Sequence, residues 1–132
     1  MRSKSLFFLL LTVLVLAATG CNDKVTVRGK VTLSDDQSPL TVGTVVFQTN
    51  TFQARATLNP DGTYLMGTLS DKDGIPKGTY QVTINGAVEP VGGDASKFIV
   101  PKMQPLIVPL KDMTVVVDGK QKEYDIVVDR AK

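Results

Sequence analysis

The chain has 132 residues, which is enough for one small domain. Apolar residues make up 42% and charged residues 21%, a balance typical of globular proteins rather than disordered or fibrous ones. The sequence contains no histidine, no tryptophan and a single cysteine. This composition excludes an intramolecular disulfide, catalysis by histidine, histidine-ligated metals and cysteine-rich zinc sites.

Residues 1–20 predict an export signal. Arg2 and Lys4 precede an apolar run from Leu6 to Ala18 that is broken only by Thr12. A run of this length is typical of the apolar core of a signal peptide, and it is too short for the roughly 20 helical residues that span a bilayer. We therefore expect residues 1–20 to be a cleaved signal peptide.

The single cysteine follows directly on small residues, and the run Leu16-Ala17-Ala18-Thr19-Gly20-Cys21 resembles the lipobox of bacterial lipoproteins. The resemblance implies cleavage between Gly20 and Cys21, a diacylglyceryl group on the Cys21 thiol and acylation of the new amine. Each buried methylene contributes about 0.8 kcal/mol, so two or three acyl chains hold a protein at a membrane where one chain binds only reversibly. The alternatives are a chance cysteine in a cut signal peptide and a buried free thiol.

These features predict a protein of the cell envelope whose partner is a membrane, reached through the lipid on Cys21. Residues 21–24 would be the lipidated cysteine and a short tether. The outer membrane is our first expectation, with the domain in the periplasm or on the cell surface. Residues 1–20 hold two basic and no acidic side chains, so the rest of the chain is formally neutral. No nucleic-acid partner is expected.

Alternation of apolar and polar side chains predicts β-strands along the remaining chain. The clearest strand covers residues 25–33, where Val25, Val27, Val31 and Leu33 share one face. We expect further strands at residues 44–49, 52–58, 63–69, 79–85, 106–110, 113–117 and 122–128. Such a series of short strands separated by turns predicts an all-β sandwich over residues 25–132.

Several short motifs resemble carboxypeptidase-regulatory-like domains. They are Gly29-Lys30-Val31-Thr32-Leu33 with Pro39-Leu40 and residues 43–47, Asn59-Pro60-Asp61-Gly62-Thr63-Tyr64, and residues 74–84. The resemblance covers about residues 25–128 and implies a seven-stranded, Greek-key, transthyretin-like or immunoglobulin-like sandwich. These are fold motifs, so they predict no chemistry.

Two glycine–tyrosine pairs recur in these motifs. We expect Gly62 and Gly78 to be turn glycines, with Asn59-Pro60-Asp61-Gly62 forming a tight turn. Tyr64 and Tyr80 follow them by two residues. Both rings are expected to point inward, with each hydroxyl hydrogen-bonded at the rim of the sandwich.

Sites for chemistry are weakly indicated. Asp71-Lys72-Asp73-Gly74 resembles part of a calcium loop but lacks the preceding oxygen ligand and the later glutamate, and Asp35-Asp36 is no stronger a cation site. Ser70 with a nearby lysine, Lys72 or Lys77, shows no sign of an activated nucleophile. Val91-Gly92-Gly93-Asp94 lacks the lysine and hydroxyl of a phosphate loop. We expect no catalytic residues, no metal and no cofactor.

Two aromatic residues remain as candidates for ligand contact, Phe52 and Phe98. Phe98 lies in a long segment, residues 86–105, whose prolines and Gly92-Gly93 disfavour regular strand. Our first interpretation is a crossover in which Phe98, Ile99 and Val100 cap an open end of the sandwich. The alternative is an apolar loop partly free to meet a ligand or protein.

The sequence therefore favours a non-catalytic envelope lipoprotein with a binding or structural role. The alternative is a carbohydrate- or peptide-binding accessory protein at the cell surface. Enzymatic activity is not expected, because the transthyretin-like hydrolases implied by the resemblance depend on histidines that this chain lacks.

Overall fold

A computed structural model describes residues 24–67 and 74–132, and the expected signal peptide, Cys21 and Asp71–Asp73 lie outside these residues. The described chain is all-β apart from one short 3-10 helix, η1 (Ala95–Lys97). The strands are β1 (Lys24–Val25), β2 (Val27–Leu33), β3 (Thr44–Gln48), β4 (Gln53–Thr57), β5 (Thr63–Met66), β6 (Ile75–Pro76), β7 (Gly78–Asn85), β8 (Val88–Val91), β9 (Lys102–Pro105), β10 (Thr114–Val117) and β11 (Ile126–Val128).

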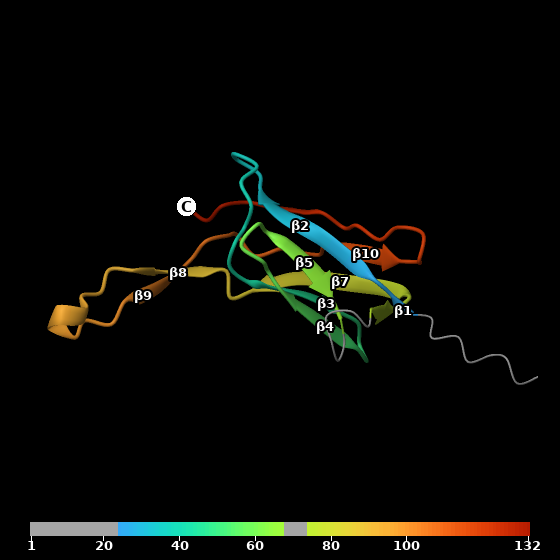
Figure 1. Cartoon of the computed structure of the whole chain (residues 1–132), viewed down its shortest axis with the longest axis horizontal. Helices are drawn as coiled ribbons and strands as arrows, with labels where there is room; N and C mark the ends of the chain where they lie inside the picture. The colour runs from blue at the N-terminus through green and yellow to red at the C-terminus, as the bar shows by residue number, and fades with distance from the viewer. Residues whose placement is uncertain (1–23, 68–73) are drawn as a thin grey trace, which may run out of the picture.

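Two sheets form the body of the molecule (Figure 1). The larger has the order β10-β7-β3-β4, with every neighbouring pair antiparallel. The smaller has the order β11-β2-β5, in which β2 is antiparallel to β5 and parallel to β11. Two short pairs, β1-β6 and β8-β9, complete the described structure. The expectation of an all-β, sandwich-like fold is confirmed.

The alternation predicted for residues 25–33 is present in the structure. In β2, Val27, Val31 and Leu33 are buried, whereas Arg28 and Lys30 are exposed. Successive side chains of a strand point to opposite faces, so this pattern places one face of β2 on the core and the other in water. The predicted strand is divided at Thr26 into β1 and β2. The first part, β1, pairs with β6 and not with the neighbours of β2.

Phe47 lies at the centre of the core, among three tyrosines. Its ring centroid is 6.2 Å from that of Tyr64, 6.0 Å from Tyr80 and 6.4 Å from Tyr124. Each tyrosine hydroxyl donates a hydrogen bond to a backbone carbonyl, of Tyr124, Pro76 and Val116 respectively. Burial raises the pKa of the Tyr64 and Tyr80 hydroxyls, because the interior disfavours a phenolate. The expectation that Tyr64 and Tyr80 point inward is confirmed.

The two expected turn glycines differ. Gly62 has φ +83° and closes the predicted turn, donating its N–H to the carbonyl of Asn59 at 2.9 Å. A positive φ is costly for other residues, which is why a glycine serves there. The expectation for Gly78 is wrong. It is the first residue of β7 and pairs with Val117, so it lies in extended backbone rather than in a turn.

The predicted strand at residues 106–110 is absent. Only an isolated bridge between Ile107 and Arg130 forms there. Two backbone hydrogen bonds flank this bridge, from the Val108 N–H to the Asp129 carbonyl and from the Ala131 N–H to the Leu106 carbonyl. Leu106 still packs against the core without belonging to a sheet. The last predicted strand is shorter than expected and is reduced to β11 with a single bridge before it.

Residues 86–105, here called the arm, form a β-hairpin of β8, η1 and β9 and correct the expectation that this segment lacks regular strand. Figure 1 shows the arm projecting from the sandwich at the end opposite β1. Leu106 donates its N–H to the carbonyl of Ala87, which makes these two residues a hydrogen-bonded pair. Pairs alternate in an antiparallel ladder, so Pro90 and Pro105 fall in non-hydrogen-bonded pairs, where a missing N–H costs no ladder bond.

Candidate functional site

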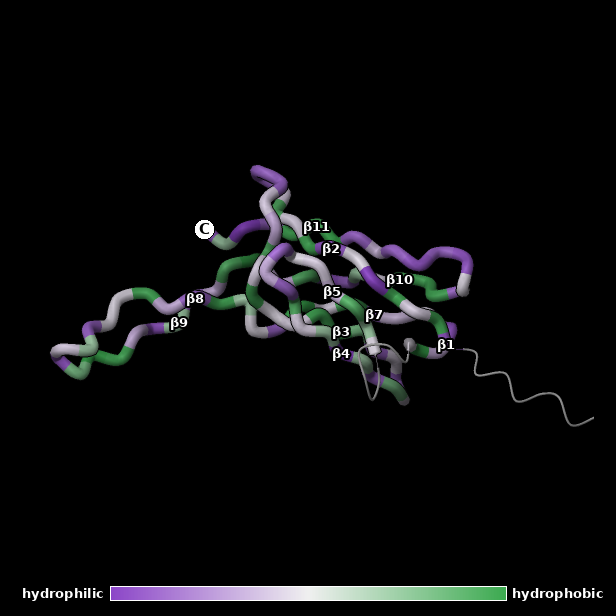
Figure 2. Tube along the Cα trace, viewed as in Figure 1, coloured by the Kyte–Doolittle hydropathy of each residue, from purple (hydrophilic) through white to green (hydrophobic). Residues whose placement is uncertain are grey.

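Phe98 lies at the tip of the arm, and the expectation that it caps the sandwich is wrong. Its side chain is 94% exposed, and those of Ile99 and Val100 are 52% and 85% exposed. The β8–β9 ladder holds the tip away from the sandwich, so none of the three can reach an open end of the core. Figure 2 shows apolar chain in the arm, outside the sandwich. The alternative interpretation, an exposed apolar segment, describes the observed position.

Phe52, the other aromatic candidate, is not a free platform. It is partly buried and packs against the core, with its ring edge-on to Tyr80 at a centroid distance of 6.1 Å. Its backbone N–H donates to Thr49 Oγ1 at 3.0 Å, which fixes the turn between β3 and β4. Phe52 therefore covers the edge of the core, and only part of its side chain is exposed for a ligand.

The arm has two chemically different faces. The register of β8 and β9 puts Val88 opposite Pro105 and Pro90 opposite Met103, so one face is entirely apolar. The other face carries the remaining pairs, Glu89 with Gln104 and Val91 with Lys102. A hollow of about 450 Å³ lies on the arm and is lined by Val91, Gly92 and residues 102–105.

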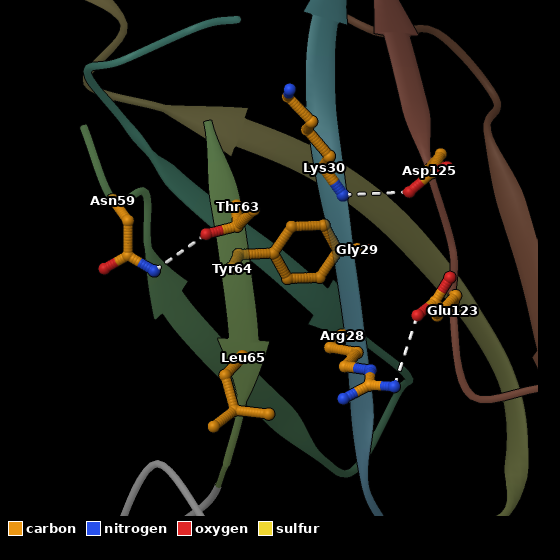
Figure 3. A pocket seen from close by; sticks show the side chains of 9 residues that line it. All are labelled: Arg28, Gly29, Lys30, Asn59, Thr63, Tyr64, Leu65, Glu123 and Asp125. Carbon is orange, nitrogen blue, oxygen red and sulfur yellow. Dashed lines mark hydrogen bonds and ion pairs between the residues drawn. The ribbon is translucent and has the colours of Figure 1, made fainter. Parts of the chain in front are cut away.

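A wider groove of about 620 Å³ lies over the outer face of the three-stranded sheet (Figure 3). Its charged groups come from β2 and from the segment leading into β11. Arg28 Nη2 is 3.2 Å from Glu123 Oε1, and the Lys30 N–H donates to Asp125 Oδ1 at 3.0 Å. Sequence reasoning did not single this groove out, and the only signal available was the outward position of these charges.

Several polar groups of the groove have partners within it. Arg28 pairs with Glu123, Asp125 accepts from the backbone N–H of Lys30, and Asn59 Nδ2 donates to Thr63 Oγ1 at 3.1 Å. The side chains of Arg28 and Glu123 are more than 60% exposed, so water competes for both charges. The groove carries two positive and two negative side chains, so it has no net charge. Exposed, balanced charges of this kind are typical of the solvent-facing side of a sheet.

The acidic pair Asp35-Asp36 binds an arginine. Arg130 Nε is 2.7 Å from Asp35 Oδ2, and Arg130 Nη2 is 3.3 Å from Asp36 Oδ2. Hydrogen bonds from the Ser38 hydroxyl and N–H, helped by Arg130, lower the pKa of Asp36 to about 2. Among residues 24–67 and 74–132, no three acidic or cysteine side chains gather as metal ligands.

The remaining sequence candidates lie outside the described residues, apart from the glycine-rich run that ends at Asp94. Asp71, Lys72 and Asp73 of the calcium-like run, and Ser70, lie outside the described residues. Asp94 of the glycine-rich run caps η1, where its carboxylate accepts hydrogen bonds from the Ser96 N–H and hydroxyl. Gly20 and Cys21 also lie outside the described residues, so their roles remain predictions.

Replacing Phe98 by alanine is expected to change the free energy of unfolding by less than about 0.5 kcal/mol, because the ring is almost fully exposed. Phe47→Ala is the control, since its ring is fully buried and its removal should cost about 3–5 kcal/mol. Urea denaturation of both variants measures the difference. Comparable losses would mean that the arm folds back onto the core.

Comparison with known proteins finds a likeness in fold but no match in sequence. No protein family's sequence pattern matches the chain, and no curated protein matches it. A crystal structure of a variant of BcpA, the major pilin subunit of Bacillus cereus, is similar, with a TM-score of 0.51 and 13% sequence identity. The match covers 83% of this chain and 30% of the pilin chain. This likeness shows that the chain shares an all-β fold with part of the pilin.

No helix in the described part of the chain is long and apolar enough to cross a membrane.

Proposed function

We propose that this chain is a non-catalytic, lipid-anchored module of the cell envelope. The observation that carries the proposal is the position of Cys21, directly after an apolar run and small residues that resemble a lipobox. The first strand, β1, begins at Lys24. A tether of two residues, Asn22 and Asp23, would therefore keep the folded domain beside the membrane.

We also propose the finer fold that the sequence motifs imply, a seven-stranded Greek-key sandwich of the transthyretin-like kind. The four-stranded and three-stranded sheets support it, because together they supply that number of main strands. The buried positions of Tyr64 and Tyr80, which belong to the motifs, support it as well.

A binding role at the envelope is supported by the arm. It presents exposed Phe98 and a hollow lined by residues 91–92 and 102–105, and both features lie outside the sandwich core. A carbohydrate- or peptide-binding accessory protein is the second candidate, because exposed aromatic rings stack on sugars and apolar side chains. Loss of glycan or peptide binding in Phe98→Ala, with unchanged stability, is the result that would support it.

The anchor is tested by replacing Cys21. The wild-type protein is expected to partition into the detergent phase and to incorporate labelled palmitate, because acyl chains on Cys21 make it amphiphilic. Cys21→Ala should do neither. Asn22→Ala is the matched control and should behave as the wild type, since it leaves the thiol in place. A wild-type protein that is unlabelled and soluble in the periplasm would refute the anchor.

A further inference from the structure

The arm concentrates the exposed apolar side chains of the molecule. Among the described residues, nine large apolar side chains are exposed, and five of them lie on the arm: Val91, Phe98, Ile99, Val100 and Met103. Three are consecutive at the tip, where Phe98 has φ +55° and follows η1. An exposed cluster of this kind marks a contact with a partner or a membrane.

The edges of the arm are poorly suited to strand addition. Pro90 and Pro105 occupy non-hydrogen-bonded pairs, so the N–H that each lacks is one that would point outward. Proline at such positions blunts an edge against pairing with another strand. A peptide or a second copy of the chain would therefore find incomplete ladders on both sides of the arm.

The tip, next to η1, lies at the free end of the projecting arm (Figure 1), and the hollow on the arm is lined by other residues, 91–92 and 102–105. A narrow apolar protrusion needs either a preformed pocket or a medium that moulds around it. The interface of a bilayer is such a medium, and it accepts aromatic and aliphatic side chains at the level of the head groups.

Lysines flank the tip on both sides. Lys97 precedes Phe98 and Lys102 begins β9, and both are exposed. The long aliphatic stem of lysine lets its ammonium remain at the phosphates while neighbouring apolar groups lie deeper. Asp94, the acidic group of the tip, is held by Ser96 and by Lys97, whose Nζ lies 3.9 Å from Asp94 Oδ2. Two lysines and one aspartate give the tip a net positive charge around its exposed apolar side chains.

We propose that residues 98–100 insert into the interface of a phospholipid bilayer, with Lys97 and Lys102 at the phosphate level. This goes beyond the proposed anchor and rests on it only for the orientation of the domain. The arm and β1 lie at opposite ends of the long axis (Figure 1). A domain anchored near β1 would therefore lie along the membrane when its arm tip is inserted.

The test uses the intact lipoprotein and a cysteine reporter at the tip. Cys21 is the only natural cysteine, so once it is acylated, Val100→Cys supplies the single reactive thiol. The chain, labelled with a polarity-sensitive fluorophore, is reconstituted in vesicles of phosphatidylethanolamine and phosphatidylglycerol. We expect a shift of emission to shorter wavelength and quenching by lipids brominated on their acyl chains.

Two matched variants define the result. Gln104→Cys places the same reporter on the polar face of the arm, nearer its base, and should show little quenching. Adding Phe98→Ser to the Val100→Cys chain should strongly reduce the quenching, because the tip loses its largest apolar group. Equal quenching at positions 100 and 104, or no change with Phe98→Ser, would overturn insertion by the tip.

Binding of the tip to a protein would give a different fluorescence result. A blue shift at position 100 without quenching by brominated lipid would mean that the tip is buried in a protein, whether a second copy or another chain, and would overturn the proposal. Failure of the anchor is recognised separately. A wild-type chain that takes up the fluorophore has a free Cys21 thiol, and the tip is then assessed by the difference in quenching between the Val100→Cys and wild-type chains.

Discussion

An aspartate in place of Val31 is expected to unfold the domain or nearly so. Val31 is fully buried in β2 and lies opposite Ile126 of β11, in the middle of the smaller sheet. A carboxylate there would lose its water without gaining a partner, at a cost of several kcal/mol. Small domains are stable by only about 5–15 kcal/mol. Far-UV circular dichroism and urea denaturation of the chain from residue 22 onward measure the loss.

Arg28→Ala is the control for Val31→Asp, because it lies in the same strand on the opposite face. The Arg28 side chain is 62% exposed, and its ion pair with Glu123 is open to solvent. Such pairs contribute little, so we expect a loss below about 0.5 kcal/mol. Similar losses for both variants would contradict the assignment of one buried and one solvent-exposed face to β2.

The second large effect is expected at Gly29, where no side chain fits. A Cβ at this position would lie 2.1 Å from the carbonyl oxygen of Tyr124 and 2.9 Å from the hydroxyl of Tyr64. Gly29→Ala must therefore push β2 away from residues 122–124, which hydrogen-bond to the Arg28 backbone. We expect a loss of about 2–4 kcal/mol in the free energy of unfolding, from overpacking and from the weakened Tyr64 hydrogen bond.

Gly78→Ala is the matched control, since Gly78 also lies in a strand. The nearest atom to a Cβ at Gly78 is Tyr80 Cε2 at 3.8 Å, an ordinary contact distance. Alanine should be tolerated there, and it can add stability by restricting the unfolded chain. Urea denaturation of the two variants side by side tests the difference. A Gly29→Ala protein as stable as Gly78→Ala would contradict the close approach of Tyr124 to β2.

Local physics made several features predictable from the sequence. The period-two pattern of residues 25–33 decides which face of β2 is buried, because a shift of one residue would place every valine in water. The turn at Asn59–Gly62 depends on a glycine at positive φ and on Asp61, whose carboxylate accepts hydrogen bonds from Thr63. Signals of this kind act within a few residues, so they can be recognised without the fold.

Other features depend on residues far apart in the chain. Gly29 is required by Tyr124, which approaches it only because β11 and the segment before it lie parallel to β2. Nothing near Gly29 in the sequence indicates that contact. Residues 106–110 are a second case: they have the apolar character of a strand, yet the segment forms only a single bridge.

The arm shows most clearly which features follow from the sequence and which depend on tertiary structure. The sequence by itself determined that residues 86–105 form a long segment that is apolar in part and rich in proline and glycine. Those residue types predict an irregular loop, because proline usually breaks a ladder. Only the tertiary structure decided that Pro90 and Pro105 fall in non-hydrogen-bonded pairs, since that depends on the register of β8 against β9. With the ladder intact, the hairpin extends outward and leaves Phe98 in solvent.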